Sequence, residues 1–441
     1  MAYAKDGYPV EQASKIGHLK LVGNELIRRV IEDFEDISPS SDGPKVSKTG
    51  SVDLTAESGI RRIITVDGGQ AVVPNPARRE KAMAFVQVAA CLLRMDDLRY
   101  MREHPLMDPR DVNKMIEGAV WYNPAAIPLA GVHHPGLTVQ QTIRRIVDRT
   151  LSETGLYETL SFLVYRGWET DWGVPEEEQP HMSCVSCDRE IYLPRWQLSF
   201  ECPECGSRHT LSDYLSIGTQ GPEDWSREEA ASALRDALET LSLMHFLRVY
   251  RDDEEVLGET LFVKDGPLLL RAALARLVLP IRDFIGYLRS EGRPPNLVGV
   301  EKTGNFTDFL DEYRQALEEP GDYFLPTVRF VVEEITGSVM TEGYRNRVSY
   351  GAKIGVRIGP DHLLALNVPT GSFLTEPEPK DLVGLEASIR SLSELVSYRY
   401  PNALIPLVLA NSAASIARRP SGNILSAFAD SLMHTTTTPS S

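Results

Sequence analysis

Two hydrophobic runs far apart in the chain each lead into an aspartate followed by glycine. The run at 63–66 precedes Asp67, and the run at 261–263 precedes Asp265. Short apolar runs bounded by turn residues predict buried β-strands. Because an ionised carboxylate is costly to bury, two strands that each deliver an aspartate to their ends indicate a functional role for the pair.

The apolar and polar pattern predicts further elements around these strands. Residues 8–35 have the spacing of an amphipathic helix, whereas 36–60 are polar and rich in serine and glycine, which predicts a linker. Residues 80–94 follow a turn-rich segment, and we interpret them as the hairpin partner of the strand at 61–67. Residues 106–175 are expected to form a mainly helical insertion.

The second half of the chain predicts alternating helices and strands. Residues 226–250 are strongly amphipathic, with Ser226 as N-cap and Glu229 three residues later, the signature of a capping box. The other expected elements are helices at 268–290, 307–319 and 380–397, strands at 295–304, 346–359 and 363–369, and an apolar C-terminal helix. The tail at 431–441 is of low complexity and is expected to be disordered.

The composition is that of an ordinary globular protein, with 42% hydrophobic and 24% charged residues in a chain of 441. The start lacks a signal-peptide pattern, and the longest uncharged apolar run, at 402–417, is short for a bilayer span. We therefore expect a soluble, cytoplasmic protein without a membrane partner. The net charge of −16 argues against a protein coated with DNA-binding surface, but it does not exclude a local basic groove.

Four of the five cysteines have the spacing CxxC–x14–CxxC; they are Cys184, Cys187, Cys202 and Cys205. Two-residue spacing lets two thiolates on one tight turn reach the same tetrahedral ion, and a second turn completes the set. The pattern resembles a zinc ribbon at 180–212, and a site closed by four cysteines is structural rather than catalytic. Two disulfides or an iron–sulfur cluster are the alternatives. Cys91 stands in an apolar run and is interpreted as a buried small hydrophobe.

The Asp-Gly pairs have two interpretations. An Asp-Gly pair is a common hairpin turn, but Pro267 and the apolar stretch after it favour a strand-to-helix junction at Asp265. Neighbouring strand ends can bring Asp67 and Asp265 together, and a third carboxylate from a helix completes a site for hard divalent cations. We choose Glu239 because it lies at the edge of the apolar face of its helix; Asp236 is the rival, and a solvated glutamate is the alternative.

Four motifs, in this order, resemble the NurA nucleases: "IITVDGG", "RDALET", "FVKDGPLLL" and "LVGVEKTG". The segments "VSYGAKIGVRI…LLALNVP" and "YRYPNAL" look like the remaining family segments. The resemblance runs from roughly residue 60 to 420 and implies a NurA-like domain at 61–430, interrupted by the helical insertion and the zinc ribbon. It further implies an RNase H-like α/β fold, a mixed sheet flanked by helices, in a homodimer.

The resemblance also implies an activity. NurA proteins are manganese-dependent DNA nucleases that work with HerA, a hexameric ATPase that feeds them duplex DNA. Carried over to this chain, Asp67, Glu239 and Asp265 hold Mn²⁺ or Mg²⁺, and Tyr400 matches a family tyrosine near the active site. Where the family has a histidine after that tyrosine, this chain has Asn411, which either substitutes as a polar ligand or donor or weakens the C-terminal contribution to catalysis.

The leading hypothesis is a metal-dependent DNA nuclease, acting as an exonuclease on DNA ends and by extension as an endonuclease on single strands. It would work with a HerA-like ATPase in DNA end processing or antiviral defence. Lys302 is expected to neutralise charge on the phosphate or to contact the backbone, and Tyr350 and Lys353 are weaker candidates for the same groove. The alternatives are a NurA-like adaptor that has lost cleavage and a zinc-ribbon DNA-binding regulator.

Overall fold

The computed structural model describes residues 48–74, 82–104, 106–108, 110, 112, 119–130, 133–169, 179–218, 223–338, 343–396 and 404–416. The helix expected at 8–35, the tail at 431–441 and the candidate residue Tyr400 lie outside these ranges.

One large mixed sheet runs through the described residues and contains nine strands in the order β1-β11-β12-β13-β10-β9-β2-β3-β4. Strand β9 pairs in parallel with both β2 and β10, and the other neighbouring pairs are antiparallel. The strands of this sheet are β1 (Lys48–Ser51), β2 (Arg62–Pro74), β3 (Ala82–Arg94), β4 (Val120–Ala130), β9 (Thr260–Asp265), β10 (Asn296–Glu301), β11 (Asp322–Leu325), β12 (Gly351–Arg357) and β13 (Leu363–Pro369). Two small hairpins stand apart from it: β5 (His181–Ser183) with β6 (Glu190–Tyr192), and β7 (Ser199–Glu201) with β8 (Arg208–Thr210).

Helices of very different length connect the strands. The α-helices are α3 (Met95–Glu103), α5 (Val139–Glu153), α6 (Leu156–Val164), α7 (Glu223–Tyr250), α8 (Glu254–Gly258), α9 (Val278–Ser290), α10 (Asn305–Glu312), α11 (Val328–Phe330), α12 (Tyr344–Val348), α13 (Leu385–Ser393) and α14 (Ile405–Ala414). Short 3-10 or π turns are η2 (Leu211–Leu215), η3 (Ala272–Leu277), η4 (Arg314–Ala316), η5 (Val331–Ile335) and η6 (Pro379–Asp381).

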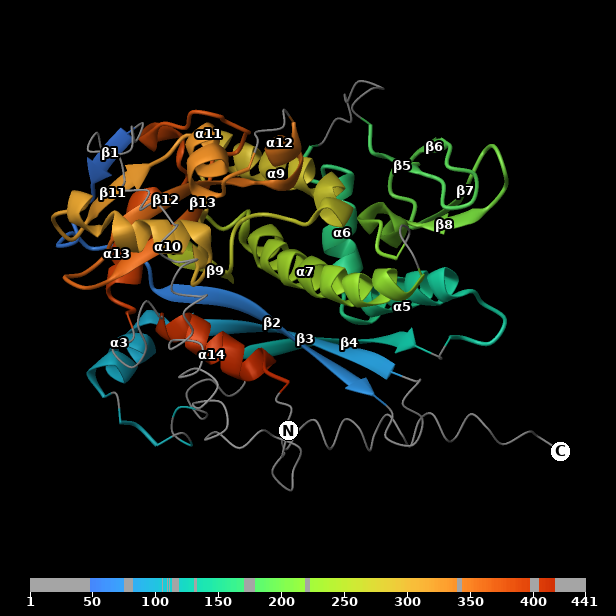
Figure 1. Ribbon diagram of the computed structural model, residues 1–441, viewed down its shortest axis with the longest axis horizontal. Helices are drawn as coiled ribbons and strands as arrows, with labels where there is room; N and C mark the ends of the chain where they lie inside the picture. Colours follow the sequence, from blue (N-terminus) through green and yellow to red (C-terminus); the bar gives the residue numbers. More distant parts are fainter. Residues whose placement is uncertain are drawn as a thin grey trace, which may run out of the picture. The chain divides into compact units, whose positions relative to one another are not determined.

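Helices cover both faces of the sheet (Figure 1). Each face has its own hydrophobic core. On one face α5, α6, α7 and α9 pack over Ile64, Val66 and Phe262. On the other face α3, α13 and α14 pack over Ile63 and Val263. Because successive side chains of a strand point to opposite faces, β2 and β9 are buried on both sides, which explains their continuous hydrophobic runs. The expected α/β class, a large mixed sheet flanked by helices, is confirmed.

Several predicted elements are confirmed, and three strands of the large sheet, β1, β4 and β11, were missed. The hairpin partner of β2 is β3, in register from Arg62–Arg94 to Pro74–Ala82. Strand β1 lies within the expected linker at 36–60, and β4 lies within the stretch at 106–175 that was expected to be mainly helical. Both are edge strands of the sheet. The sequence of β4 contains two prolines, which central strands exclude but edge strands tolerate, so its pattern does not predict a strand.

Two predicted helices have different boundaries. Helix α7 begins at Glu223, so Ser226 lies inside it and is not its N-cap. The helix expected at 268–290 begins only with η3 at Ala272. Before it, the backbone of 268–270 exchanges hydrogen bonds with residues 348–350: Leu270 N donates to Val348 O at 2.8 Å and Tyr350 N to Leu268 O at 3.0 Å. These bonds hold the segment after Asp265 extended.

Candidate functional site

The two Asp-Gly strands lie side by side, and their aspartates meet where β9 ends. Pairing between β2 and β9 runs as far as Val66 and Lys264. Strand β9 stops at Asp265, whereas β2 continues to Pro74. The sequence suggested that Asp67 ends its strand, and this was wrong. Asp67 lies inside the long strand β2, beside the end of the short strand β9. Among the described residues, no strand pairs with that edge of β2 beyond Val66.

Asp67 and Asp265 project from the same face of the sheet. Asp67 alternates with Ile63, and Asp265 alternates with Val263, and both of these belong to the core under α14. The Asp67 carboxyl is 9% exposed, and Lys302 Nζ lies 2.6 Å from Asp265 Oδ2. Burial, and after it the negative charge of Asp265, raises the pKa of Asp67 to about 6, while the backbone N–H of Gly68 and the charge of Lys302 act in the opposite direction.

Glu239 approaches the same strand from the other face, on α7. It is 6% exposed; its Oε2 lies 3.5 Å from Lys264 Nζ and its Oε1 lies 3.4 Å from Arg235 Nε. Burial raises the pKa of Glu239 to about 7, against the opposing charge of Lys264. The rival Asp236 is instead held by Arg271, whose Nε lies 2.7 Å from its Oδ2.

Consecutive glycines in β2 allow both neighbouring helices to come close to the strand. A Cβ on Gly68 would collide with Glu239 Oε1, and a Cβ on Gly69 would collide with the carbonyl oxygen of Ala414 at the end of α14. The sequence "DGG" therefore forms no turn: it lies inside β2 and gives Glu239 access to one face of the strand and α14 access to the other. Both glycines and Lys264 were missed as site residues, and the unusual Gly-Gly inside a hydrophobic hairpin was the available signal.

The three carboxylates converge on the end of β9 from two sides but do not form one compact ligand set. In the described part of the chain, only the four clustered cysteines bring three or more potential ligand atoms within 4.8 Å of one another. Lys302 and Lys264 neutralise Asp265 and Glu239. Asp67 and Glu239 are buried carboxylates with raised pKa values, and such carboxylates favour binding a proton or a divalent cation over remaining ionised alone.

The remaining predicted residues occupy other positions. Lys353 forms an ion pair with Glu301 at the end of β10, and Asn367 Nδ2 donates to the same Glu301 at 2.5 Å. Tyr350 is buried, with 1% of its surface exposed. Asn411 is exposed on α14, one helical turn before the end that packs on Gly69.

The four predicted cysteines come together on two matching turns. Cys184 N donates to Arg189 O at 2.7 Å and Cys202 N to Ser207 O at 2.9 Å, and these turns end the hairpins β5–β6 and β7–β8. The Sγ atoms of Cys184 and Cys205 lie 3.6 Å apart. A tetrahedral zinc ion with about 2.3 Å bonds to sulfur sets sulfur atoms about 3.8 Å apart, so the thiols fit such an ion. All five cysteines are free, and Cys91 is buried, as expected. The two-disulfide alternative is wrong for this structure.

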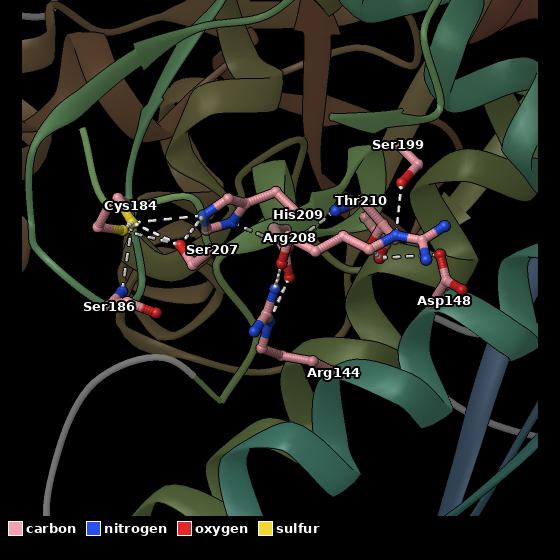
Figure 2. A network of polar contacts seen from close by, with 12 residues as sticks. Arg144, Asp148, Cys184, Ser186, Ser199, Ser207, Arg208, His209 and Thr210 are labelled. Carbon is pink, nitrogen blue, oxygen red and sulfur yellow. Dashed lines mark hydrogen bonds and ion pairs between the residues drawn. The ribbon is translucent and has the colours of Figure 1, made fainter. Parts of the chain in front are cut away.

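A buried histidine that the sequence analysis missed supports the cysteine cluster. His209 is fully buried; its Nε2 lies 3.3 Å from Cys184 Sγ, and its Nδ1 lies 3.4 Å from Asp213 Oδ2. Arg144 on α5 donates from Nη2 to the same Asp213 oxygen at 2.6 Å. Figure 2 shows His209 directed toward Cys184 and Ser207, with Arg144 approaching from its helix. The chain of contacts ties the cysteine turns to α5.

No protein-family model matches this chain, and no curated protein is similar enough to be matched with it. None of the helices that the structure describes is both long enough and apolar enough to span a membrane.

Proposed function

We propose that this chain is a metal-dependent DNA nuclease of the NurA type, with an RNase H-like core. The observation that carries the proposal is the meeting of Asp67 and Asp265 at the end of β9, with Lys302 2.6 Å from Asp265 Oδ2. A three-stranded antiparallel meander, β4-β3-β2, continued by the parallel strands β9 and β10, supports the RNase H-like core.

The donor set suits Mn²⁺ or Mg²⁺. Asp67 and Asp265 provide hard oxygen ligands on one face of the sheet. Glu239 lies on α7 at the other face and would become a third ligand only after a rearrangement at the end of β9. The bound ion would supply Lewis-acid activation of water and of the phosphate for hydrolysis of the phosphodiester bond. Lys302 lies next to these carboxylates and can bind a phosphate oxygen once it is released from Asp265. Lys264 forms an ion pair with Glu239 and fixes the position of its carboxylate.

For the cysteine cluster we propose a structural Zn²⁺ site of the zinc-ribbon type. The four thiol groups lie within 4.8 Å of one another, and His209, with its proton on Nε2, can donate a hydrogen bond to the Cys184 thiolate. The proposed partners are DNA, a HerA-like hexameric ATPase and a second copy of this chain, in a cytoplasmic setting of DNA end processing or antiviral defence.

The test is cleavage of end-labelled linear DNA by the purified chain with Mn²⁺, with Mg²⁺ or without added divalent ions. The expected result is Mn²⁺-dependent degradation that falls at least a hundredfold in Asp67→Asn and Asp265→Asn. Asp361→Asn, which changes an exposed carboxylate in the turn after β12, should keep full activity. Unchanged cleavage by the Asp265 variant would refute the assignment.

A second function has specific support. Lysines already neutralise Asp265 and Glu239, and Asn411, which stands where the family has a histidine, is exposed. These features also suit a NurA-like adaptor that docks an ATPase and DNA without cutting. Tight binding of a HerA-like ATPase with no cleavage of any DNA end, in the presence of Mn²⁺ and ATP, would favour the adaptor. Cleavage by the isolated chain would exclude it.

A further inference from the structure

A cleft of about 370 Å³ lies between the beginning of the cysteine hairpins, the end of α6 and the N-terminal part of α9. Its size lies within the range of about 300–1,000 Å³ that is typical of ligand pockets. Four arginines line it: Arg166, Arg276, Arg282 and Arg347. Arg166 lies in the turn after α6, and the other three lie on η3, α9 and α12; we call this feature the arginine cleft. Leu279, 56% exposed at its edge, shows that the cleft opens to solvent.

The arginine cleft is positively charged in a chain of net charge −16. Among its described lining residues there is a single acid, Asp283, and Arg166 Nη2 lies 2.9 Å from Asp283 Oδ2. Two further acids lie next to the cleft, Glu169 at 3.8 Å from Arg166 Nη1 and Glu190 at 3.2 Å from His181 Nε2. Within the described part of the chain, Arg276, Arg282 and Arg347 form no ion pair with a carboxylate. Arg347 is exposed on α12 and can reach a ligand without rearrangement of the core.

Arg282 gives the strongest indication of an anionic ligand. It is only 5% exposed, and its hydrogen bonds go to neutral groups: Nε donates to Ser349 O at 2.9 Å and Nη1 to Asn346 Oδ1 at 2.7 Å. Burial lowers the pKa of Arg282 to about 10, so the side chain remains charged at neutral pH. A buried charge is costly unless an opposite charge compensates it. Asp283 supplies part of that compensation but is shared with Arg166, and an anionic ligand in the cleft would add to it.

We propose that the arginine cleft binds the phosphodiester backbone of a single strand of DNA. The inference rests on the proposed nuclease function, and it names the surface that holds the strand. Guanidinium groups match phosphate oxygens in pairs. His181, half-exposed on the cleft wall and in edge contact with Tyr192, offers a ring on which a base can stack. Stacking on such a ring needs an unpaired base, which a single strand offers and an intact duplex does not.

The experiment measures fluorescence anisotropy of a labelled single-stranded oligonucleotide with the full-length, zinc-containing protein. Mn²⁺ and Mg²⁺ are left out so that the probe is not cut. Arg347→Glu and Arg347→Gln are compared with Arg149→Glu, which makes the same charge change at an exposed position of α5 paired with Glu153. We expect Arg347→Glu to weaken binding at least tenfold and Arg149→Glu less than twofold. In Arg347→Gln the slope of log K against log salt should fall by about 0.7.

Several outcomes would overturn the assignment. Equal loss of affinity in Arg347→Glu and Arg149→Glu would indicate a general charge effect. Absence of binding by the wild-type protein at low salt would refute the proposal that the cleft binds a single strand. Competition by inorganic phosphate as effective as that by unlabelled oligonucleotide would indicate single phosphates rather than a strand. If Arg347→Glu weakens binding and the wild type still fails to cleave DNA, the arginine cleft is supported and the nuclease proposal fails. If the wild type cleaves DNA and Arg347→Glu binds the strand as tightly as Arg149→Glu, the nuclease proposal is supported and the arginine cleft fails.

Discussion

Replacing Asp67 with asparagine should stabilise the fold at alkaline pH while it removes the proposed activity. The pKa of this carboxyl rises from 3.8 to about 6, chiefly because the group is buried and secondly because Asp265 is close. At roughly 1.4 kcal/mol per unit, the ionised form costs the folded state about 3 kcal/mol. The pKa of Asp67 is higher in the folded protein than in the unfolded chain. The contribution of this carboxyl to stability is therefore complete below the unfolded pKa near 4 and is lost as the pH rises through the folded pKa of about 6.

The assay is urea unfolding followed by tryptophan fluorescence at pH 8 and pH 5, on zinc-containing protein without Mn²⁺ or Mg²⁺. We expect Asp67→Asn to raise the free energy of unfolding by about 2–3 kcal/mol at pH 8 and by clearly less at pH 5. Asp361→Asn, at an exposed turn, should change neither value. Adding Mn²⁺ should stabilise the wild type by mass action. The difference in free energy of unfolding between the wild type and Asp67→Asn should then become smaller. No gain at pH 8, or the same gain at both pH values, would refute the reasoning.

Three further predictions concern the carboxylate site and the cysteine cluster. Mn²⁺ affinity measured by calorimetry should increase from pH 5.5 to pH 7.5 with release of protons, because the pKa values of Asp67 and Glu239 are raised to about 6 and about 7; pH-independent affinity would contradict a site on these carboxylates. Gly68→Ala should lower the free energy of unfolding by about 1–3 kcal/mol, because its Cβ meets Glu239, whereas Gly258→Ala, which points into open space, should not; equal melting temperatures would show that Glu239 moves aside at little cost. Cys202→Ser should lose the bound zinc and lower the melting temperature, whereas Cys91→Ala should keep a full equivalent of zinc by metal analysis; zinc retained in the Cys202 variant would place the ion elsewhere.

The sequence predicted those parts of the fold whose patterns are local. The hydrophobic runs at 63–66 and 261–263, the helix containing Glu239 and the paired cysteine turns are all present in the structure. Strands β1 and β4 escaped prediction because edge strands need neither a continuous apolar run nor a complete set of backbone donors. The contacts of His209 with Cys184 and Asp213 depend on how two hairpins pack against α5, and nothing in the spacing alone specifies that packing.

The position of the carboxylates follows from the unequal lengths of two parallel strands. Were β9 as long as β2, another strand residue would stand beside Gly68, and the aspartates would be enclosed in the sheet. Because β9 ends at Asp265, no strand in the described part of the chain pairs with this edge of β2 beyond Val66. The two glycines carry no side chains, so α7 comes close to one face of β2 there and α14 to the other. The sequence analysis treated Asp67 and Asp265 as equivalent strand ends. In the structure only Asp265 ends its strand, and this difference creates room beside Asp67.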